Sequence, residues 1–161
     1  MKTPQKQILY IEDHEDTREL VTLVLANYRV TTTPSSKEAL KLARQQHFDL
    51  YLLDSWLPDG SGLELCQQLR EFDRETPIMF LSAAAYETDK QAALDSGAQS
   101  YMVKPADIQG LSFEVDALIL GFGNNKVQKI GSLRTRFFER LSTDAPTMKT
   151  AVLNQESSAA R

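Results

Sequence analysis

The fold is decided by the stretch Leu50-Tyr51-Leu52-Leu53-Asp54-Ser55-Trp56-Leu57-Pro58-Asp59-Gly60-Ser61-Gly62. Four apolar residues in a row end abruptly at a carboxylate, and a turn rich in Pro and Gly follows. This pattern is typical of a buried parallel strand. Asp54 then lies in the loop at the carboxyl end of that strand, which is where open α/β sheets bind ligands. A carboxylate at this place can be a nucleophile, a metal ligand or a helix cap.

The length and composition favour one globular domain. The chain has 161 residues, of which 42% are hydrophobic and 25% are charged, and these values are ordinary for a soluble protein. No apolar run approaches the ~18 residues of a transmembrane helix, and residues 1–7 lead into a short strand instead of a signal-peptide core. We therefore expect a cytoplasmic protein. The single cysteine, Cys66, excludes an intramolecular disulfide and is expected to be a small core residue.

The charge is divided unevenly along the chain. Residues 1–121 hold 11 Lys/Arg against 19 Asp/Glu, which gives −8, and residues 122–161 hold 7 against 3, which gives +4. An acidic body argues against nucleic acid as a partner of the main domain, because like charges repel.

The hydrophobic pattern alternates between short apolar runs and segments of helical period. Strands are expected at residues 8–11, 29–33, 50–53, 78–81 and 100–103, and helices at residues 17–28, 35–46, 62–72, 87–96 and 107–120. The second helix starts at a Ser35-x-x-Glu38 capping box. Each connection is long enough for a crossover, so the pattern predicts a doubly wound, five-stranded parallel sheet with helices on both faces. We expect a lead-in at 1–6, this domain at 7–121 and a C-terminal extension at 122–161.

Polar side chains follow the strands of this predicted sheet. Glu12 and Asp13 come after the first strand, Asp54 after the third, Ser82 after the fourth and Lys104 after the fifth. In a doubly wound sheet these loops open on one edge, so the topology gathers three carboxylates, one hydroxyl and one ammonium. Clustered carboxylates stay ionised only beside a cation, and a mostly carboxylate ligand set suits Mg²⁺.

These same residues carry a resemblance to a known family. In their order and spacing, together with Leu57-Pro58, Gly62 and Lys104-Pro105, they resemble the receiver domain of bacterial response regulators over residues of about 7–121. The resemblance implies a flavodoxin-like fold with strand order 2-1-3-4-5. It also implies a phosphoacceptor in a two-component or phosphorelay pathway, and not an enzyme that turns over a substrate.

The resemblance assigns the acceptor and the metal site. Asp54 is expected to take a phosphoryl group from a phosphohistidine on a sensor histidine kinase or a histidine phosphotransfer protein. Mg²⁺ is expected to be held by Asp13, Asp54 and the backbone carbonyl of Trp56, with Glu12 acting mainly through water.

The resemblance also assigns the phosphoryl contacts. Lys104 and the hydroxyl of Ser82 would bind phosphoryl oxygens with help from the backbone amide of Ala83, and Pro105 would follow a cis peptide bond. Movement of Ser82 would let Tyr101 turn inward. The face formed by residues 87–96, 100–103 and 107–120 would then change for a downstream protein target or a second copy of the chain.

Three further side chains near the acceptor receive separate interpretations. Trp56 is bulky and Ala84 is small and apolar, at the positions that control access of water in this family, so we predict a long-lived phosphorylated state. Asp59 follows Pro58 and is interpreted as turn chemistry only.

The extension leaves its role open. Residues 126–141 have the pattern of a basic amphipathic helix, and residues 142–161 have a composition typical of disorder. The helix can pack on the acidic body or dock a partner protein; membrane or nucleic-acid binding is less favoured. Forty residues are too few for a DNA-binding output domain with its own core, so we expect none.

Two other functions use a similar pattern. A metal-dependent phosphatase or phosphotransferase of the haloacid-dehalogenase type also has a strand-end aspartate nucleophile, but it usually has a second aspartate where Trp56 stands here. A flavodoxin-like cofactor protein would need a hydroxyl- and glycine-rich phosphate loop after the first strand, and the sequence has Glu12-Asp13 there instead.

Overall fold

The computed structural model describes residues 3–104 and 108–121. Within them, one sheet is formed by five parallel strands: β1 (Gln7–Ile11), β2 (Arg29–Thr33), β3 (Leu50–Leu53), β6 (Ile78–Ser82) and β7 (Ser100–Val103). Their order is β2-β1-β3-β6-β7. Counting only the strands of this sheet, this is the predicted order 2-1-3-4-5, so the predicted fold class is confirmed.

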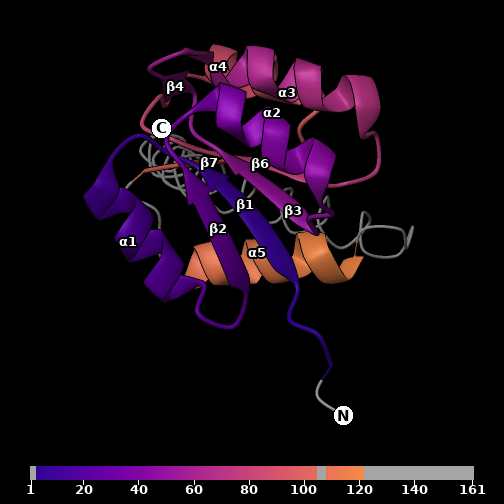
Figure 1. The fold of residues 1–161 in the computed structure, drawn as a ribbon. Coiled ribbons are helices and arrows are strands. Elements are labelled where there is room, and N and C mark those ends of the chain that lie inside the picture. The colour runs from indigo at the N-terminus through magenta and orange to yellow at the C-terminus, as the bar shows by residue number, and fades with distance from the viewer. Residues whose placement is uncertain (1–2, 105–107, 122–161) are drawn as a thin grey trace, which may run out of the picture. The chain divides into compact units, whose positions relative to one another are not determined.

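Helices cover both faces of the sheet (Figure 1). They are α1 (Glu15–Val24), α2 (Ser36–Gln45), α3 (Gly62–Phe72), α4 (Glu87–Asp95) and α5 (Ile108–Gly121). The helices α2, α3 and α4 lie on one face, and α1 and α5 lie on the other. All five were predicted; α1 to α4 each connect two strands of the sheet as a crossover, and α5 follows the last strand, β7.

The prediction for α1 was wrong at both ends, because residues 17–28 were expected and residues 15–24 are helical. Glu15 and Asp16 fill the first turn, where carboxylates interact favourably with the positive end of the helix dipole. At the other end, the Tyr28 amide donates to the Leu25 carbonyl in a turn that leads into β2. Acidic side chains therefore belong to the start of the helix and not only to the preceding loop.

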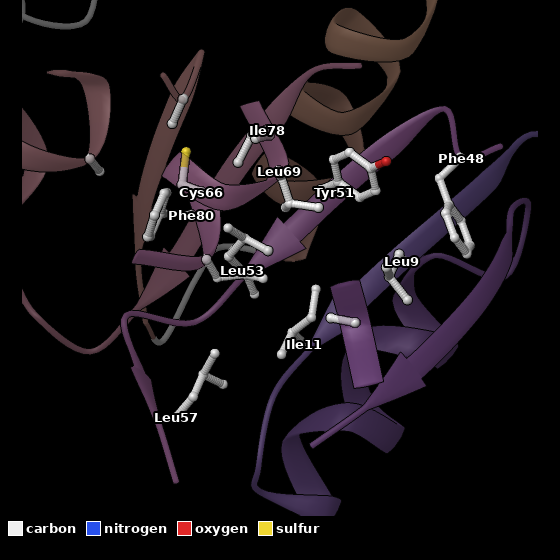
Figure 2. Close-up of a cluster of buried hydrophobic side chains, with 14 residues drawn as sticks. Leu9, Ile11, Phe48, Tyr51, Leu53, Leu57, Cys66, Leu69, Ile78 and Phe80 are labelled. Carbon is white, nitrogen blue, oxygen red and sulfur yellow. The ribbon is translucent and has the colours of Figure 1, made fainter. Parts of the chain in front are cut away.

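The central strands β1, β3 and β6 are buried on both faces because each face has its own core. Alternate residues of a strand point to opposite sides. On the face of α2, α3 and α4, a cluster forms around Leu9, Tyr51, Leu53 and Phe80 (Figure 2), and the predicted core residue Cys66 lies in it. The other cluster, on the face of α1 and α5, is built on Ile8, Tyr10, Leu50, Leu52, Met79 and Leu81, with Val21, Leu25, Leu111 and Val115 from the helices.

A small hairpin that was not predicted lies between β3 and α3. Its arms are β4 (Trp56–Leu57) and β5 (Gly60–Ser61), which pair antiparallel across the turn residues Pro58 and Asp59. Leu57 is buried in the core, and the Gly62 amide donates to the Ser55 carbonyl at 2.9 Å. The loop after Asp54 is therefore an ordered hairpin, and the hydrogen bond from Gly62 to Ser55 joins its two ends.

Some sequence predictions lie outside the described residues. These are Pro105 with its expected cis bond, the basic amphipathic helix at 126–141 and the disordered tail at 142–161. Within residues 3–104 and 108–121, no helix has the length and apolar character needed to cross a membrane.

Candidate functional site

The carboxyl ends of the strands bring the predicted site residues together. In the sheet, Ile11 of β1 is the register partner of Leu53 of β3, so the residues that follow them, Glu12 and Asp54, leave adjacent strands side by side. On the other side of β3, Ser82 ends β6, and its carbonyl accepts from the Lys104 amide at 2.8 Å. The topology thus gathers side chains that are up to 92 positions apart in sequence.

Three carboxylates form a cluster at this edge. Glu12, Asp13 and Asp54 each offer an oxygen, and these atoms all lie within 4.8 Å of one another. Glu12 is fully buried and Asp54 is 6% exposed, whereas Asp13 is exposed. Two carboxylates of the cluster, Glu12 and Asp54, are therefore buried, and the cluster is open to solvent at Asp13.

Glu12 is held in one orientation by three donors. The Lys104 ammonium is ion-paired with its Oε2. The Tyr10 hydroxyl donates to the same oxygen at 3.2 Å, and the His14 amide donates to Oε1 at 3.2 Å. A fully buried carboxylate requires such partners, because an unpaired buried charge is strongly destabilising.

Asp54 lies beside the same cation. Its Oδ2 is 3.6 Å from Lys104 Nζ, and its Oδ1 accepts from the Ser55 amide at 2.7 Å. Burial raises the pKa of the Asp54 carboxyl above its ordinary value; the Lys104 ammonium opposes this shift and the Glu12 carboxylate adds to it. Burial therefore destabilises the ionised form of Asp54, and a further cation near this carboxylate would stabilise it.

The donor set fits a divalent cation. Three carboxylate oxygens in close reach, with Asp13 open to solvent, are the hard oxygen ligands that Mg²⁺ prefers, with space for water. Lys104 neutralises only part of the charge, because one ammonium serves both Glu12 and Asp54. The chemistry of these residues therefore supports the expected magnesium site.

Ser82 and Tyr101 are linked through one backbone unit. The hydroxyl of Ser82, which is fully buried, accepts from the Ala84 amide at 3.1 Å. The Tyr101 hydroxyl donates to the Ala84 carbonyl at 2.6 Å, and its ring stacks on Phe80 with centroids 5.9 Å apart. The two residues expected to act as a switch therefore contact the two polar groups of the same residue.

The remaining predicted residues lie around the rim. Trp56, on β4, is 70% exposed, so its indole is not packed in the core. Ala83 is exposed and Ala84 is half-buried in the loop between β6 and α4. Neither alanine side chain carries a polar group that could orient water near Asp54.

Sequence reasoning missed two residues at this edge. Arg18, on α1, donates from Nη1 to the Glu12 carbonyl at 2.7 Å and to the Asp13 carbonyl at 3.0 Å, and so it holds the backbone of the acidic pair. The only feature of the sequence that points to Arg18 is its position near the start of α1, the helix that follows Glu12 and Asp13. Asp59 was interpreted as turn chemistry only, and this was wrong, because its carboxylate contacts the start of α2.

Comparison with known proteins agrees with this geometry. The family model of the response regulator receiver domain matches residues 8–116. Response regulator ArlR of Staphylococcus aureus is 37% identical over 115 residues, which cover 70% of this chain and 52% of that protein. The chain thus spans about half the length of this curated relative.

Solved structures show the same fold. A response regulator from Chloroflexus aurantiacus superimposes with a TM-score of 0.70 at 29% identity, over 73% of this chain and 99% of that chain. The receiver domain of a sensor histidine kinase from Pseudomonas aeruginosa, which has a magnesium ion coordinated in its active site cleft, gives 0.67 at 28% identity, over 72% and 98%. The family model, the relative and the site geometry agree, and the chain belongs to the response regulator receiver domain family of two-component signalling.

Proposed function

We propose that this receiver domain is a phosphoacceptor and that Asp54 is the residue that takes the phosphoryl group. The observation that carries the proposal is the position of Asp54 at the carboxyl end of the sheet, beside the buried Glu12 and within 3.6 Å of the Lys104 ammonium that the two carboxylates share. The donor is a phosphohistidine on a sensor histidine kinase or a histidine phosphotransfer protein, as expected for a two-component pathway.

In the proposed transfer, a carboxylate oxygen of Asp54 attacks the phosphorus atom. A P–O bond forms as the P–N bond breaks, and the electron pair of the P–N bond returns to the imidazole of the donor. Lys104 pairs with a phosphoryl oxygen and offsets its charge. The Ser82 hydroxyl and the Ala83 amide donate hydrogen bonds to the others.

Mg²⁺ is the proposed cofactor. Asp13, Asp54 and the Trp56 carbonyl would hold it directly, and Glu12 would act through water, because Glu12 is already bound by Lys104, Tyr10 and the His14 amide. When bound, the ion offsets the repulsion between the carboxylates and the phosphoryl group. The magnesium in the related Pseudomonas receiver domain supports this assignment.

The proposed signal passes from Ser82 to Tyr101 through Ala84. A hydroxyl that turns toward the phosphoryl group no longer accepts from the Ala84 amide, so the backbone that also holds the Tyr101 hydroxyl is released. Tyr101 can then change its packing. This two-state element would bias the surface around it.

The proposed output surface is the face of α4, β7 and α5. Its members include three exposed apolar side chains, one on or beside each element: Tyr86 at 78%, Val103 at 39% and Phe113 at 52%. Exposed apolar side chains on neighbouring elements favour a protein as the downstream target. A cytoplasmic location remains a prediction from the sequence.

The test is labelling of the full chain with acetyl phosphate and Mg²⁺, read by intact mass and peptide mapping. The wild type is expected to gain one phosphoryl group at Asp54, and Asp54→Ala is expected to gain none. The matched control is Asp95→Ala, which removes an exposed carboxylate of α4 and should label normally. Steady hydrolysis of many equivalents without labelled protein would instead support the phosphatase alternative.

A further inference from the structure

The hairpin after Asp54 carries the backbone carbonyl that the proposed metal site uses, so its position matters for the site. Two anchors hold its base and one arm. The Gly62 amide donates to the Ser55 carbonyl, and the Leu57 side chain is buried in the core. Neither anchor reaches the tip, where Pro58 and Asp59 form the turn between β4 and β5.

Asp59 holds the tip against the start of α2. Its Oδ1 accepts from the Ser36 amide at 2.9 Å and the Ser36 hydroxyl at 3.1 Å. Its Oδ2 accepts from the Ser35 hydroxyl at 2.9 Å and the Lys37 amide at 3.0 Å. These donors are 22 to 24 positions away in sequence, so the contact joins two separate parts of the chain.

The carboxylate of Asp59 is suited to this contact. Partial burial alone would raise its pKa, but the hydrogen bonds from Lys37, Ser36 and Ser35 outweigh burial and lower the pKa to about 2. The first backbone amides of a helix have no partner within the helix, and they carry the positive end of its dipole. Asp59 supplies this negative cap from another loop, while Ser35 caps the Glu38 amide at 3.2 Å.

We propose that Asp59 is a positioning residue for the metal site, because it fixes the hairpin whose Trp56 carbonyl is assigned to the ion. The inference rests on the proposed function. The contact restricts the hairpin at its tip, and the buried Leu57 and the Gly62 amide restrict it at its base. A ligand whose backbone is already ordered binds with a smaller entropic cost than one that must be ordered on binding.

The experiment compares full-length wild type, Asp59→Ala and Glu38→Ala by NMR titration with MgCl₂ alone. Glu38 lies in the first turn of the same helix, so its removal changes the charge there by the same amount and leaves the contacts of Asp59 in place. We expect Asp59→Ala to raise the Kd for Mg²⁺ roughly tenfold, because the hairpin must then be ordered when the ion binds. Glu38→Ala should stay within about twofold of wild type, because it touches no group of the hairpin.

A second readout needs no metal. Amide hydrogen exchange of residues 55–61 should quicken in Asp59→Ala and stay at the wild-type rate in Glu38→Ala. Asp59→Asn, which keeps one acceptor oxygen, should fall between wild type and Asp59→Ala in both readouts and serves if Asp59→Ala does not fold.

The outcomes separate the two proposals. Wild-type Mg²⁺ affinity in Asp59→Ala, or in Asp59→Asn where that variant is used, overturns the positioning role even if the variant is less stable. Unchanged exchange at residues 55–61 overturns it as well. If the wild type itself shows no Mg²⁺ binding at Glu12, Asp13 and Asp54, the proposed metal site fails, and the exchange data still decide whether Asp59 fixes the hairpin.

Discussion

The two edges of the sheet each carry a cluster of polar side chains, and these clusters shift the pKa of an aspartate in opposite directions. At the carboxyl edge, burial raises the pKa of Asp54, with Glu12 adding to the shift. At the amino edge, burial also acts to raise the pKa of Asp73, but hydrogen bonds from Thr76, Tyr51 and the Glu75 amide lower it overall.

The amino-edge cluster is saturated with donors. Asp73 accepts from the Tyr51 hydroxyl at 2.8 Å, the Thr76 hydroxyl at 2.7 Å and the Thr76 amide at 3.0 Å. Arg70 beside it donates to the carbonyls of Asp73, Thr76 and Gly97. These contacts join the connections α3–β6 and α4–β7 to the sheet, and they satisfy both the Asp73 carboxylate and the Arg70 guanidinium.

The difference shows how one fold places stabilising carboxylates and reactive carboxylates at opposite edges of the same sheet. A carboxylate that is satisfied by neutral donors stabilises the fold and is chemically inert. A carboxylate that is packed against another carboxylate and a shared ammonium is costly to ionise, and it gains most from a cation or a reaction that removes charge. In this chain, the first arrangement lies at the amino edge and the second at the carboxyl edge.

The largest expected effect comes from a pair of glycines, one at each edge. A Cβ on Gly62 would lie 2.2 Å from the Asp54 carbonyl oxygen and 2.9 Å from the Phe80 ring, so backbone must move. A Cβ on Gly97 would lie 2.9 Å from the Arg70 side chain, which can yield more readily than backbone, and the φ of +116° at Gly97 is strained for alanine. We expect Gly62→Ala to cost about 3 kcal/mol and Gly97→Ala about 1–2 kcal/mol of the free energy of unfolding.

Urea denaturation measures the free energy of unfolding of the two glycine variants. Acetyl phosphate labelling shows whether each substitution also affects Asp54. Gly62→Ala should also slow labelling of Asp54, whereas Gly97→Ala should label at the wild-type rate. Equal stability losses with equal labelling would remove the distinction between the edges.

The second effect tests the saturated cluster. Asp73→Ala leaves the Tyr51 and Thr76 hydroxyls without their acceptor, and we expect a loss of about 2 kcal/mol in the free energy of unfolding with no change in labelling. Asp73→Asn keeps the shape and part of the acceptor capacity, so it should lose less. A labelling defect in either variant at matched folded fraction would argue that the amino edge does communicate with the acceptor.

The third effect is the pH dependence of stability, measured without divalent cations. The folded pKa of Asp73 is lowered, so its stabilisation is present above the unfolded pKa of ~4 and is lost as pH falls through the folded value. The folded pKa of Asp54 is raised, so its ionised form destabilises the fold at neutral pH, and this penalty disappears as pH falls below ~4.

Two neutral variants separate these contributions. Asp54→Asn should be more stable than wild type at pH 7, and Asp73→Asn should be less stable. The Asp54 difference should shrink as pH falls from the raised folded pKa toward ~4, and the Asp73 difference should shrink as pH falls from ~4 toward its lowered folded pKa. Differences of the same sign at pH 7 would falsify the opposite treatment of the two aspartates.

The smallest effect concerns the lifetime of the proposed phosphorylated state. Trp56→Asn replaces an exposed indole by a polar side chain that can orient water, and we expect dephosphorylation to quicken roughly fivefold, or ~1 kcal/mol in activation free energy. Trp56→Phe keeps a bulky apolar ring and should decay at about the wild-type rate. Equal lifetimes in all three proteins would leave Trp56 without a role in this step.

Most of the fold and the members of the candidate site could be predicted because they follow local rules. Runs such as Leu50–Leu53 predict buried parallel strands, and Asp54 and Lys104 each follow such a run directly. The ends of α1 and the hairpin β4–β5 were not predicted, because neighbouring structure and not the local pattern decides where short elements begin. The same limit explains the misreading of Asp59, whose partners lie in another loop.

By itself, the sequence determined the order of strands and helices, the family and the residue types that meet at one edge of the sheet. Hydrophobic period and strand-end position are local properties, and parallel topology does the rest. The tertiary structure alone decided that Lys104 serves both Glu12 and Asp54, that Ala84 joins Ser82 to Tyr101, and that Asp59 caps α2. These are contacts between segments that are distant in sequence. Their distances and burial, which only the tertiary structure fixes, determine how each side chain is paired and in which direction its pKa shifts.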